Sequence, residues 1–360
     1  MPTALSPFAP RASGALAVCA ALLLSAGCGA APERTAEQPP GAAEERDLRF
    51  TSGPDTLHGT FAVPKGASGK VPGALIVSGS GPTDRDGNSD MRPNADTNRN
   101  FARVLADAGV ASLRYDKLGS GDTGMASHAK DDRIGYDVFE QEMTDAYAEL
   151  AAQPGVDPGR LMVLGHSEGS LFALRAPQVI EENPPKALVL AAPVGNRYLD
   201  TVDRQITEQV RGGESQGRFD AERATAVLSD TRLAIARVRG GHPVPDDIAP
   251  ELDALFRPEL GPFLRRIDGL DPARLGADLP ADVATLVLWG EADSQVVRQD
   301  VDRLMTGLDG AERVDLPDTD HVFRVYHDSP GSPVLDDERD FSPDVAPALT
   351  GFVDSALAGA

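Results

Sequence analysis

The stretch RLMVLGHSEGSLFALR, residues 160–175, places a serine between two glycines at the point where an apolar run stops. Residues 161–164 have the continuous apolar character of a buried strand, and the residues from Leu171 onward have the spacing of a helix. Between them, residues 165–169 match G-x-S-x-G, whose glycines lack the Cβ atoms that would clash in a tight strand-to-helix turn. A simple Gly-Ser turn has the same composition, so Ser167 is a candidate nucleophile only if the chain supplies its partners.

Buried runs alternate with helical patterns on both sides of this motif. GALIVSG, ALVLAAP and ATLVLWG are continuous apolar runs, typical of strands that are buried on both faces. The segments DLRFTSG and LHGTFAV flank a Gly-Pro-Asp turn and predict an antiparallel hairpin. Helical patterns cover residues 136–150, 296–308 and 345–357. This order of elements predicts an α/β fold with a mostly parallel central sheet and helices on both faces.

One segment, residues 197–283, is too long for a single crossover and contains helical patterns without a convincing strand. We therefore expect a helical cap, inserted where open α/β sheets bind ligands and overhanging that site as a lid. Its first turns carry dense charge, including Asp200, Asp203 and Arg204. Such a narrow apolar stripe suits the covering of a pocket better than the binding of a lipid surface, which favours soluble, short-acyl substrates.

A serine nucleophile needs a general base, a carboxylate that orients the base, and donors for an oxyanion. In enzymes with a serine at this kind of turn, the acid and then the histidine follow it along the chain. His321 lies after the last predicted strand, in RVDLPDTDHVFR, and is the predicted base, with His327 as the alternative. In TLVLWGEADSQVV, Asp293 is preferred to Glu291 as the acid because Gly-x-x-Asp is the commoner spacing for this role.

Two backbone N–H groups complete such a site. The residue after the nucleophile, Glu168, supplies one of them. The loop that follows the GALIV run supplies the other, and alignment with the His-Gly-Gly-Gly loop of many such enzymes assigns Ser80. This chain has Ser-Gly-Ser-Gly there, which leaves the second donor open within that loop.

Two other stretches of the sequence resemble ligand-binding motifs. Residues 119–124 spell G-x-G-x-x-G, but a polar, aperiodic sequence follows them instead of the helix that a dinucleotide site needs. Residues 84–90 alternate Asp and Asn but lack the glycine and glutamate positions of an EF-hand, so we expect an Asx-rich turn in which Arg85 pairs with aspartates. No zinc pattern occurs. The sequence thus predicts neither a cofactor nor a metal.

The N-terminal segment differs from the body. Arg11 precedes a short apolar run at residues 15–24, so residues 1–27 are predicted to be a secretory signal and not a membrane span. Its end, Leu-Ser-Ala-Gly-Cys, resembles the bacterial lipoprotein signal, with Ser25 where leucine is usual, and predicts a lipid anchor on Cys28. The alternative is ordinary secretion with cleavage among residues 29–31. Residues 28–46 are rich in Ala, Pro and Glu and predict a flexible tether before a domain at residues 47–360.

Charge and cysteine content limit the possible partners. The chain of 360 residues has a formal net charge of −22, which excludes nucleic acid as a partner because nothing neutralises a phosphate backbone. Its two cysteines, Cys19 and Cys28, both lie in the N-terminal segment, so the body must be stable without disulfides. The oligomeric state is left open.

Five motifs follow one another along the chain: SGSGPTDRDGN (78–88), LRYDKLGSG (113–121), GHSEGS (165–170), WGEADSQV (289–296) and DHVF (320–323). With these motifs the chain resembles the α/β-hydrolase superfamily, and within it the bacterial serine aminopeptidase-like or dienelactone-hydrolase-like esterases. The resemblance implies an exported serine hydrolase that cleaves small-molecule carboxylic esters through an acyl-enzyme, on the outer face of the cytoplasmic membrane if Cys28 is lipidated. A peptidase or an acyltransferase would use the same triad, and a binding protein on the same scaffold would lack an activated serine.

Overall fold

The computed structural model describes residues 43–129, 132–245, 247–326 and 336–357. Within them one eight-stranded sheet has the order β1-β2-β4-β3-β5-β6-β7-β8. The first hairpin is antiparallel, β2 pairs antiparallel with β4, and every later pair is parallel. The predicted fold class and the predicted hairpin are therefore confirmed. The strands are β1 (Ala43–Ser52), β2 (Asp55–Pro64), β3 (Val71–Val77), β4 (Ala111–Tyr115), β5 (Val156–His166), β6 (Ala187–Ala191), β7 (Ala284–Gly290) and β8 (Glu312–Leu316).

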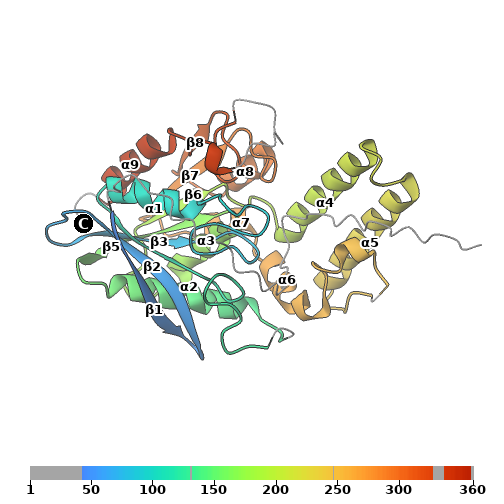
Figure 1. Cartoon of the computed structure of the whole chain (residues 1–360), viewed down its shortest axis with the longest axis horizontal. Helices are drawn as coiled ribbons and strands as arrows, with labels where there is room; N and C mark the ends of the chain where they lie inside the picture. Colours follow the sequence, from blue (N-terminus) through green and yellow to red (C-terminus); the bar gives the residue numbers. More distant parts are fainter. Residues whose placement is uncertain (1–42, 130–131, 246, 327–335, 358–360) are drawn as a thin grey trace, which may run out of the picture.

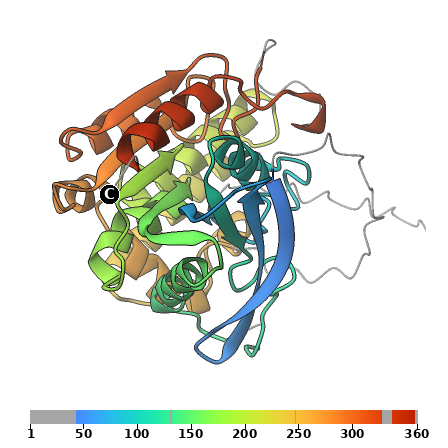
Figure 2. The ribbon, with the colours of Figure 1, turned by 90° about the vertical axis from the view of Figure 1, so that its left-hand side faces the viewer.

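Helices cover both faces of the sheet (Figures 1 and 2). Successive residues of β3 point to opposite sides, so Leu75 joins one apolar core and Ile76 the other. Helices α2 and α3 pack on the first face, and α1 and α9 pack on the second. The helices outside the cap are α1 (Thr97–Asp107), α2 (Tyr136–Ala151), α3 (Gly169–Val179), α8 (Arg298–Met305) and α9 (Val345–Ala356), with a short 3-10 turn at Asp336–Glu338.

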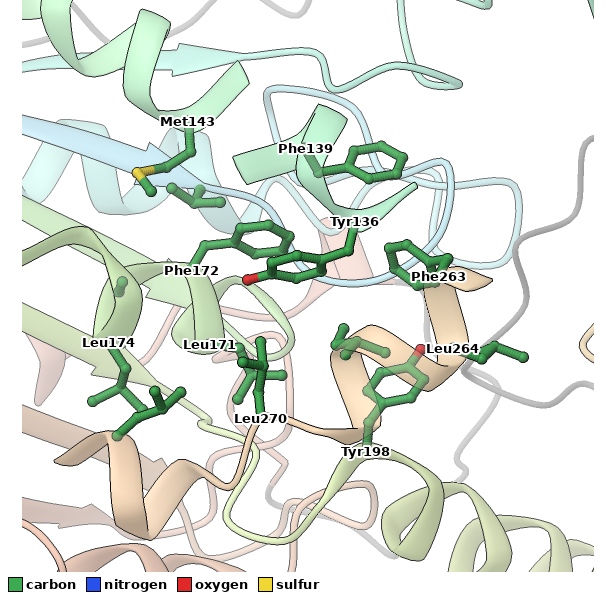
Figure 3. Packing of buried hydrophobic residues seen from close by; sticks show 14 of the residues in the cluster. Tyr136, Phe139, Met143, Leu171, Phe172, Leu174, Tyr198, Phe263, Leu264 and Leu270 are labelled. Carbon is green, nitrogen blue, oxygen red and sulfur yellow. The ribbon is translucent and has the colours of Figure 1, made fainter. Parts of the chain in front are cut away.

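The segment predicted to form a cap contains only helices in its described part, and it projects beyond one end of the sheet (Figure 1). It is joined to the body by aromatic packing. The ring of Tyr136 on α2 stacks on Phe172 of α3 at 4.9 Å between centroids, and Phe263 of α6 packs beside both α2 rings shown in Figure 3. The cap consists of α4 (Tyr198–Ser215), α5 (Ala221–Arg239), 3-10 turns at Pro250–Leu252 and Pro258–Leu260, α6 (Gly261–Asp268) and α7 (Pro272–Ala277).

The boundary of the predicted tether is wrong at its C-terminal end. Strand β1 begins at Ala43, inside the range predicted as tether, and pairs with β2 along its whole length from Ala43 opposite Pro64. Arg46 also lies over the ring of Phe61 at 4.9 Å. Backbone pairing with a neighbouring strand overrides the polar composition of these residues. The predicted signal segment and Cys28 lie outside the described residues.

None of the helices that the structure describes has both the length and the apolar character needed to cross a membrane.

Candidate active site

Ser167 lies at the sharp connection between β5 and α3. Its φ of 54° is in the left-handed region, which is uncommon for any residue other than glycine. The turn is held from both sides: the Ser167 N–H donates to the Ala191 carbonyl at 2.9 Å, and the Ser170 N–H donates to the Ser167 carbonyl at 3.0 Å. A strained serine fixed in this way presents its side chain at the carboxyl end of the sheet.

The two flanking glycines are required by close backbone approach. A Cβ at Gly165 would lie 2.2 Å from the Gly169 carbonyl oxygen, and a Cβ at Gly169 would lie 2.3 Å from that of Val77. Both contacts are with backbone atoms that cannot rotate away. The turn that carries Ser167 therefore accepts no side chain at either position, which explains the glycines around the serine in the sequence.

The predicted acid and base form a buried pair. The His321 Nδ1 lies 2.8 Å from Oδ2 of Asp293. Asp293 follows β7, and its Oδ1 accepts hydrogen bonds from the N–H groups of Gln295 at 2.7 Å and Val296 at 2.9 Å. Since an ionised carboxylate only accepts hydrogen bonds, Nδ1 of His321 carries the proton and Nε2 is left as an acceptor. This is the tautomer that a general base for a serine requires.

The other candidates lie elsewhere. Glu291 is on the same loop as Asp293, but its half-exposed side chain accepts a hydrogen bond from Arg298 at 2.9 Å, whereas Asp293 is the partner of His321. His327 lies outside the described residues.

Ser167 and His321 both line one cavity, which has a volume of about 130 Å³. The loop predicted to bind an oxyanion forms another wall: a Cβ at Gly79 would lie 3.2 Å from that of Ser167. Glu168 follows the serine directly at the start of α3, where the first N–H groups of a helix have no acceptor within the helix. The described lining residues are Gly79, Ser80, Gly81, Pro82, Thr83, Gly87, Ser89, Asp90, Met91, Arg92, His166, Ser167, Gln295, His321 and Val322.

The cap contributes none of the described residues that line this cavity, since all of them lie outside 197–283. The first cap helix nevertheless contacts one lining residue, Gln295. Arg204 and Gln205 of α4 both donate to the Gln295 carbonyl, at 2.6 Å and 3.2 Å. The cap is thereby connected to the loop that carries Asp293.

His166, the residue before the candidate nucleophile, contacts the base in a way that the sequence does not predict. Its Nε2 donates to the His321 carbonyl at 2.9 Å, and the two rings lie 5.0 Å apart. Burial, reinforced by the nearby His321, lowers the pKa of His166 to about 3. At neutral pH His166 is therefore uncharged, and it links the serine turn to the histidine loop. The only sequence signal for this role was its position next to the candidate nucleophile.

This depressed pKa predicts a pH dependence of stability. From pH 6.5 down to about 3, His166 takes up a proton in the unfolded chain but not in the folded one, so the free energy of unfolding falls as the pH falls. His166→Gln keeps a donor for the His321 carbonyl and cannot titrate. Between pH 7 and pH 4.5, denaturant titrations should show wild-type losing about 2 to 3 kcal/mol more than this variant. Equal losses in the two proteins would contradict the assignment.

Neither of the two stretches that resemble ligand-binding motifs, residues 119–124 and 84–90, forms such a site among the described residues. Turns follow residues 119–124 where a dinucleotide site would need a helix. In the 84–90 loop, Asp84 Oδ1 accepts from the N–H groups of Asp86 and Asn88, and Arg85 pairs with Asp116 at 2.5 Å, as expected for an Asx-rich turn. Across the described ranges, no group of three or more His, Cys, Asp or Glu side chains is placed to hold a metal ion.

The chain is similar to known proteins in family, in sequence and in structure. The profile described as "Alpha/beta hydrolase family" matches residues 71–336. Esterase EstD of Thermotoga maritima is 26% identical over 278 residues, which cover 77% of this chain. The chain spans 58% of the length of that relative.

Solved structures share the fold at low sequence identity. A ferulic acid complex of Est1E from Butyrivibrio proteoclasticus superposes with a TM-score of 0.55 at 18% identity, covering 87% of this chain and 100% of the other. The Pyrococcus furiosus esterase PF2001 has a TM-score of 0.53 at 15% identity, covering 88% of this chain and 92% of the other. At these identities the likeness concerns the fold alone.

Proposed function

Because the chain belongs to the alpha/beta hydrolase family, we propose that it is a serine hydrolase that cleaves carboxylic esters through an acyl-enzyme. The observation that carries the proposal is the Asp293–His321 pair. Its histidine lines the same cavity as Ser167, whose backbone is strained. The 26% identity with a relative described as an esterase supports ester chemistry.

Each residue has a defined task in this reaction. Ser167 Oγ attacks the ester carbonyl while Nε2 of His321 takes its proton, and Asp293 stabilises the resulting imidazolium. The carbonyl oxygen becomes an oxyanion that the N–H groups of Glu168 and Ser80 receive. Collapse of this intermediate breaks the C–O bond, and the alcohol leaves with the proton from His321. Water, activated by the same histidine, then releases the carboxylic acid and regenerates Ser167.

Amide hydrolysis and acyl transfer are the alternatives, since they use the same triad. A panel of matched p-nitrophenyl esters, p-nitroanilides and esters with added alcohol acceptors separates the three. We expect kcat/KM for the esters to exceed that for the anilides, with the free acid as the main product. A binding protein on this scaffold would turn over none of them and would not react with a fluorophosphonate.

The cap predicts a preference for short acyl chains. Among the described residues, the large hydrophobic side chains that are exposed are Met91, at the cavity, and Leu233 on α5. Such a cap has no broad apolar face with which to bind an oil surface. Rates on p-nitrophenyl esters should be highest for acetate or butyrate and should not rise as the substrate passes its solubility limit. A maximum at laurate or palmitate, or a jump at the solubility limit, would show that the cap opens onto lipid.

We further propose that the enzyme is exported and anchored through Cys28. The apolar run at residues 15–24 and the Leu-Ser-Ala-Gly-Cys sequence support this location. A diacylglyceryl cysteine with an additional N-acyl chain would hold the protein on the outer face of the cytoplasmic membrane. Mass spectrometry of the mature N-terminus should find a lipidated Cys28 in the membrane fraction. An unmodified N-terminus at residues 29–31 in the medium would instead establish ordinary secretion.

A further inference from the structure

Lys117 is a buried cation directed at the loop that forms one wall of the cavity. It follows β4 and is only 4% exposed. Its Nζ donates to the Gly79 carbonyl at 2.6 Å and to the Ser78 carbonyl at 3.4 Å. The proposed reaction gives this side chain no role, because it lies behind the loop and not among the residues that line the cavity.

The bond to Gly79 fixes the peptide group that supplies one proposed oxyanion donor. The Gly79 carbonyl and the Ser80 N–H belong to the same planar peptide group, and in a trans peptide they point in opposite directions. A cation that holds the carbonyl on one side therefore directs the N–H to the other side. A charge-assisted hydrogen bond also polarises the peptide group and makes its N–H a stronger donor.

The same ammonium reaches the residue that supplies the other proposed donor. Its Nζ lies 3.7 Å from Oε1 of Glu168, whose carboxylate is buried and whose backbone N–H is the first at the nucleophile turn. The carboxylate also acts on Tyr198 at the start of cap helix α4, because burial together with the nearby Glu168 carboxylate raises the pKa of the Tyr198 hydroxyl. Figure 3 shows Tyr198 at the junction between the cap and the body. Lys117 thus contacts the segments that supply both proposed oxyanion donors, Ser80 and Glu168. Through Glu168 it is also linked to the cap.

A second buried carboxyl group near Lys117, that of Glu142, does not form an ion pair with it at neutral pH. Glu142 accepts hydrogen bonds from the Leu118 N–H at 3.1 Å and 3.3 Å. Burial raises the pKa of Glu142 to about 8, so this group is mostly neutral at pH 7. Among the described residues, Glu168 is the carboxylate that forms an ion pair with Lys117. Lys117 therefore has one carboxylate partner, Glu168, and two backbone carbonyl partners, Ser78 and Gly79.

We propose that Lys117 is a positioning residue for the oxyanion hole, which orients the Gly79–Ser80 peptide group and the Glu168 turn toward the developing negative charge. This inference rests on the proposed ester hydrolysis. A purely structural role would affect the amount of folded enzyme. A positioning role lowers the rate of each correctly folded molecule, because it acts on donors used most strongly in the transition state.

The test is Lys117→Met, which keeps the length of the side chain and removes its charge and donors. Active sites are counted by fluorophosphonate titration, and kcat is expressed per titrated site. Complete loss of one oxyanion donor lowers kcat by about 10²- to 10³-fold, so misorientation should lower it by roughly 10- to 100-fold with KM within about twofold. The affinity for an alkyl boronic acid, whose tetrahedral adduct places an oxygen in the same position, should fall with kcat.

Arg114→Met is the matched control. Arg114 is also a buried cation of the β4 segment, but it pairs with Asp86 at 2.7 Å and Glu45 at 3.2 Å and has no recorded bond to the Ser78–Gly81 loop or to Glu168. This control should lower the melting temperature and leave kcat per site within about twofold. If Lys117→Met does not fold, Glu168→Gln replaces it, since it keeps the backbone donor and removes the anionic partner of Lys117. Its kcat should fall several-fold at constant KM.

The outcomes separate the two proposals. If wild-type enzyme neither hydrolyses esters nor reacts with the fluorophosphonate, the proposed function fails. If wild-type is active and Lys117→Met, or Glu168→Gln in its place, retains the wild-type kcat per site, the positioning role is overturned and the proposed function stands. A fall in kcat per site that the control does not share supports the positioning role.

Discussion

Ser167→Ala should lower kcat/KM for ester hydrolysis by at least about 10⁴-fold and abolish reaction with a fluorophosphonate, because the variant has no atom to form the acyl bond. Alanine occupies the volume of serine without its oxygen, so the fold should be preserved. The positive φ of 54° is strained for either residue, and the backbone hydrogen bonds that hold the turn do not involve the hydroxyl. Circular dichroism and the melting temperature check the fold, while burst kinetics and probe labelling check the chemistry.

Ser170→Ala is a suitable control for this experiment. Ser170 is buried on the same turn, and its hydroxyl donates to the Ser167 carbonyl at 2.6 Å. The same oxygen accepts from the Val194 N–H at 3.2 Å, so its loss removes two hydrogen bonds, which should lower stability by about 1 to 3 kcal/mol and should leave labelling intact. Undiminished labelling of Ser167→Ala would show that another serine is the nucleophile.

Asp293→Asn should lower kcat by roughly 10³- to 10⁴-fold, because it forces the wrong tautomer on the histidine. Two backbone N–H groups, from Gln295 and Val296, bind Oδ1 of Asp293. An asparagine must place its carbonyl oxygen there, so its NH₂ faces Nδ1 of His321. That ring nitrogen must then accept, and the proton moves to Nε2, where the base has to be unprotonated.

Glu291→Gln is the matched control, since it makes the same chemical change on the same loop. The Glu291 side chain is 44% exposed and paired with Arg298, so the variant should keep kcat within about twofold. Steady-state kinetics of both variants at pH 7 to 9 decide between the two carboxylates. Loss of activity in Glu291→Gln with retention in Asp293→Asn would reverse the assignment.

The central strands could be predicted because burial on both faces leaves a direct signature in the sequence. Strands β3, β6 and β7 and the second part of β5 contain continuous apolar runs, and their parallel order follows from the helices between them. The candidate triad could be predicted for a related reason: each of its residues follows a strand end, and the carboxyl ends of parallel strands meet at one edge of the sheet.

What could not be predicted depends on contacts between distant segments. The charged start of β1 becomes a strand only because β2 offers it backbone partners. The bond from His166 to the His321 carbonyl joins residues 155 positions apart, and that from Lys117 to Gly79 joins residues 38 apart. His166 ends strand β5 and Lys117 follows strand β4, and neither residue belongs to a periodic pattern that predicts such a contact. The folded sheet brings these segments together, so the contacts can be identified only from the structure.

The most direct test of the proposed function is the capture of the acyl-enzyme. The protein is quenched in acid during turnover of a p-nitrophenyl ester, and intact and peptide mass spectrometry locate the adduct. We expect a mass increase equal to the acyl group, confined to the peptide that contains Ser167, and an accumulation that is lost in Ser167→Ala. An active enzyme whose acyl group is found on another residue, or that shows no adduct under conditions of a measured p-nitrophenol burst, would contradict the account.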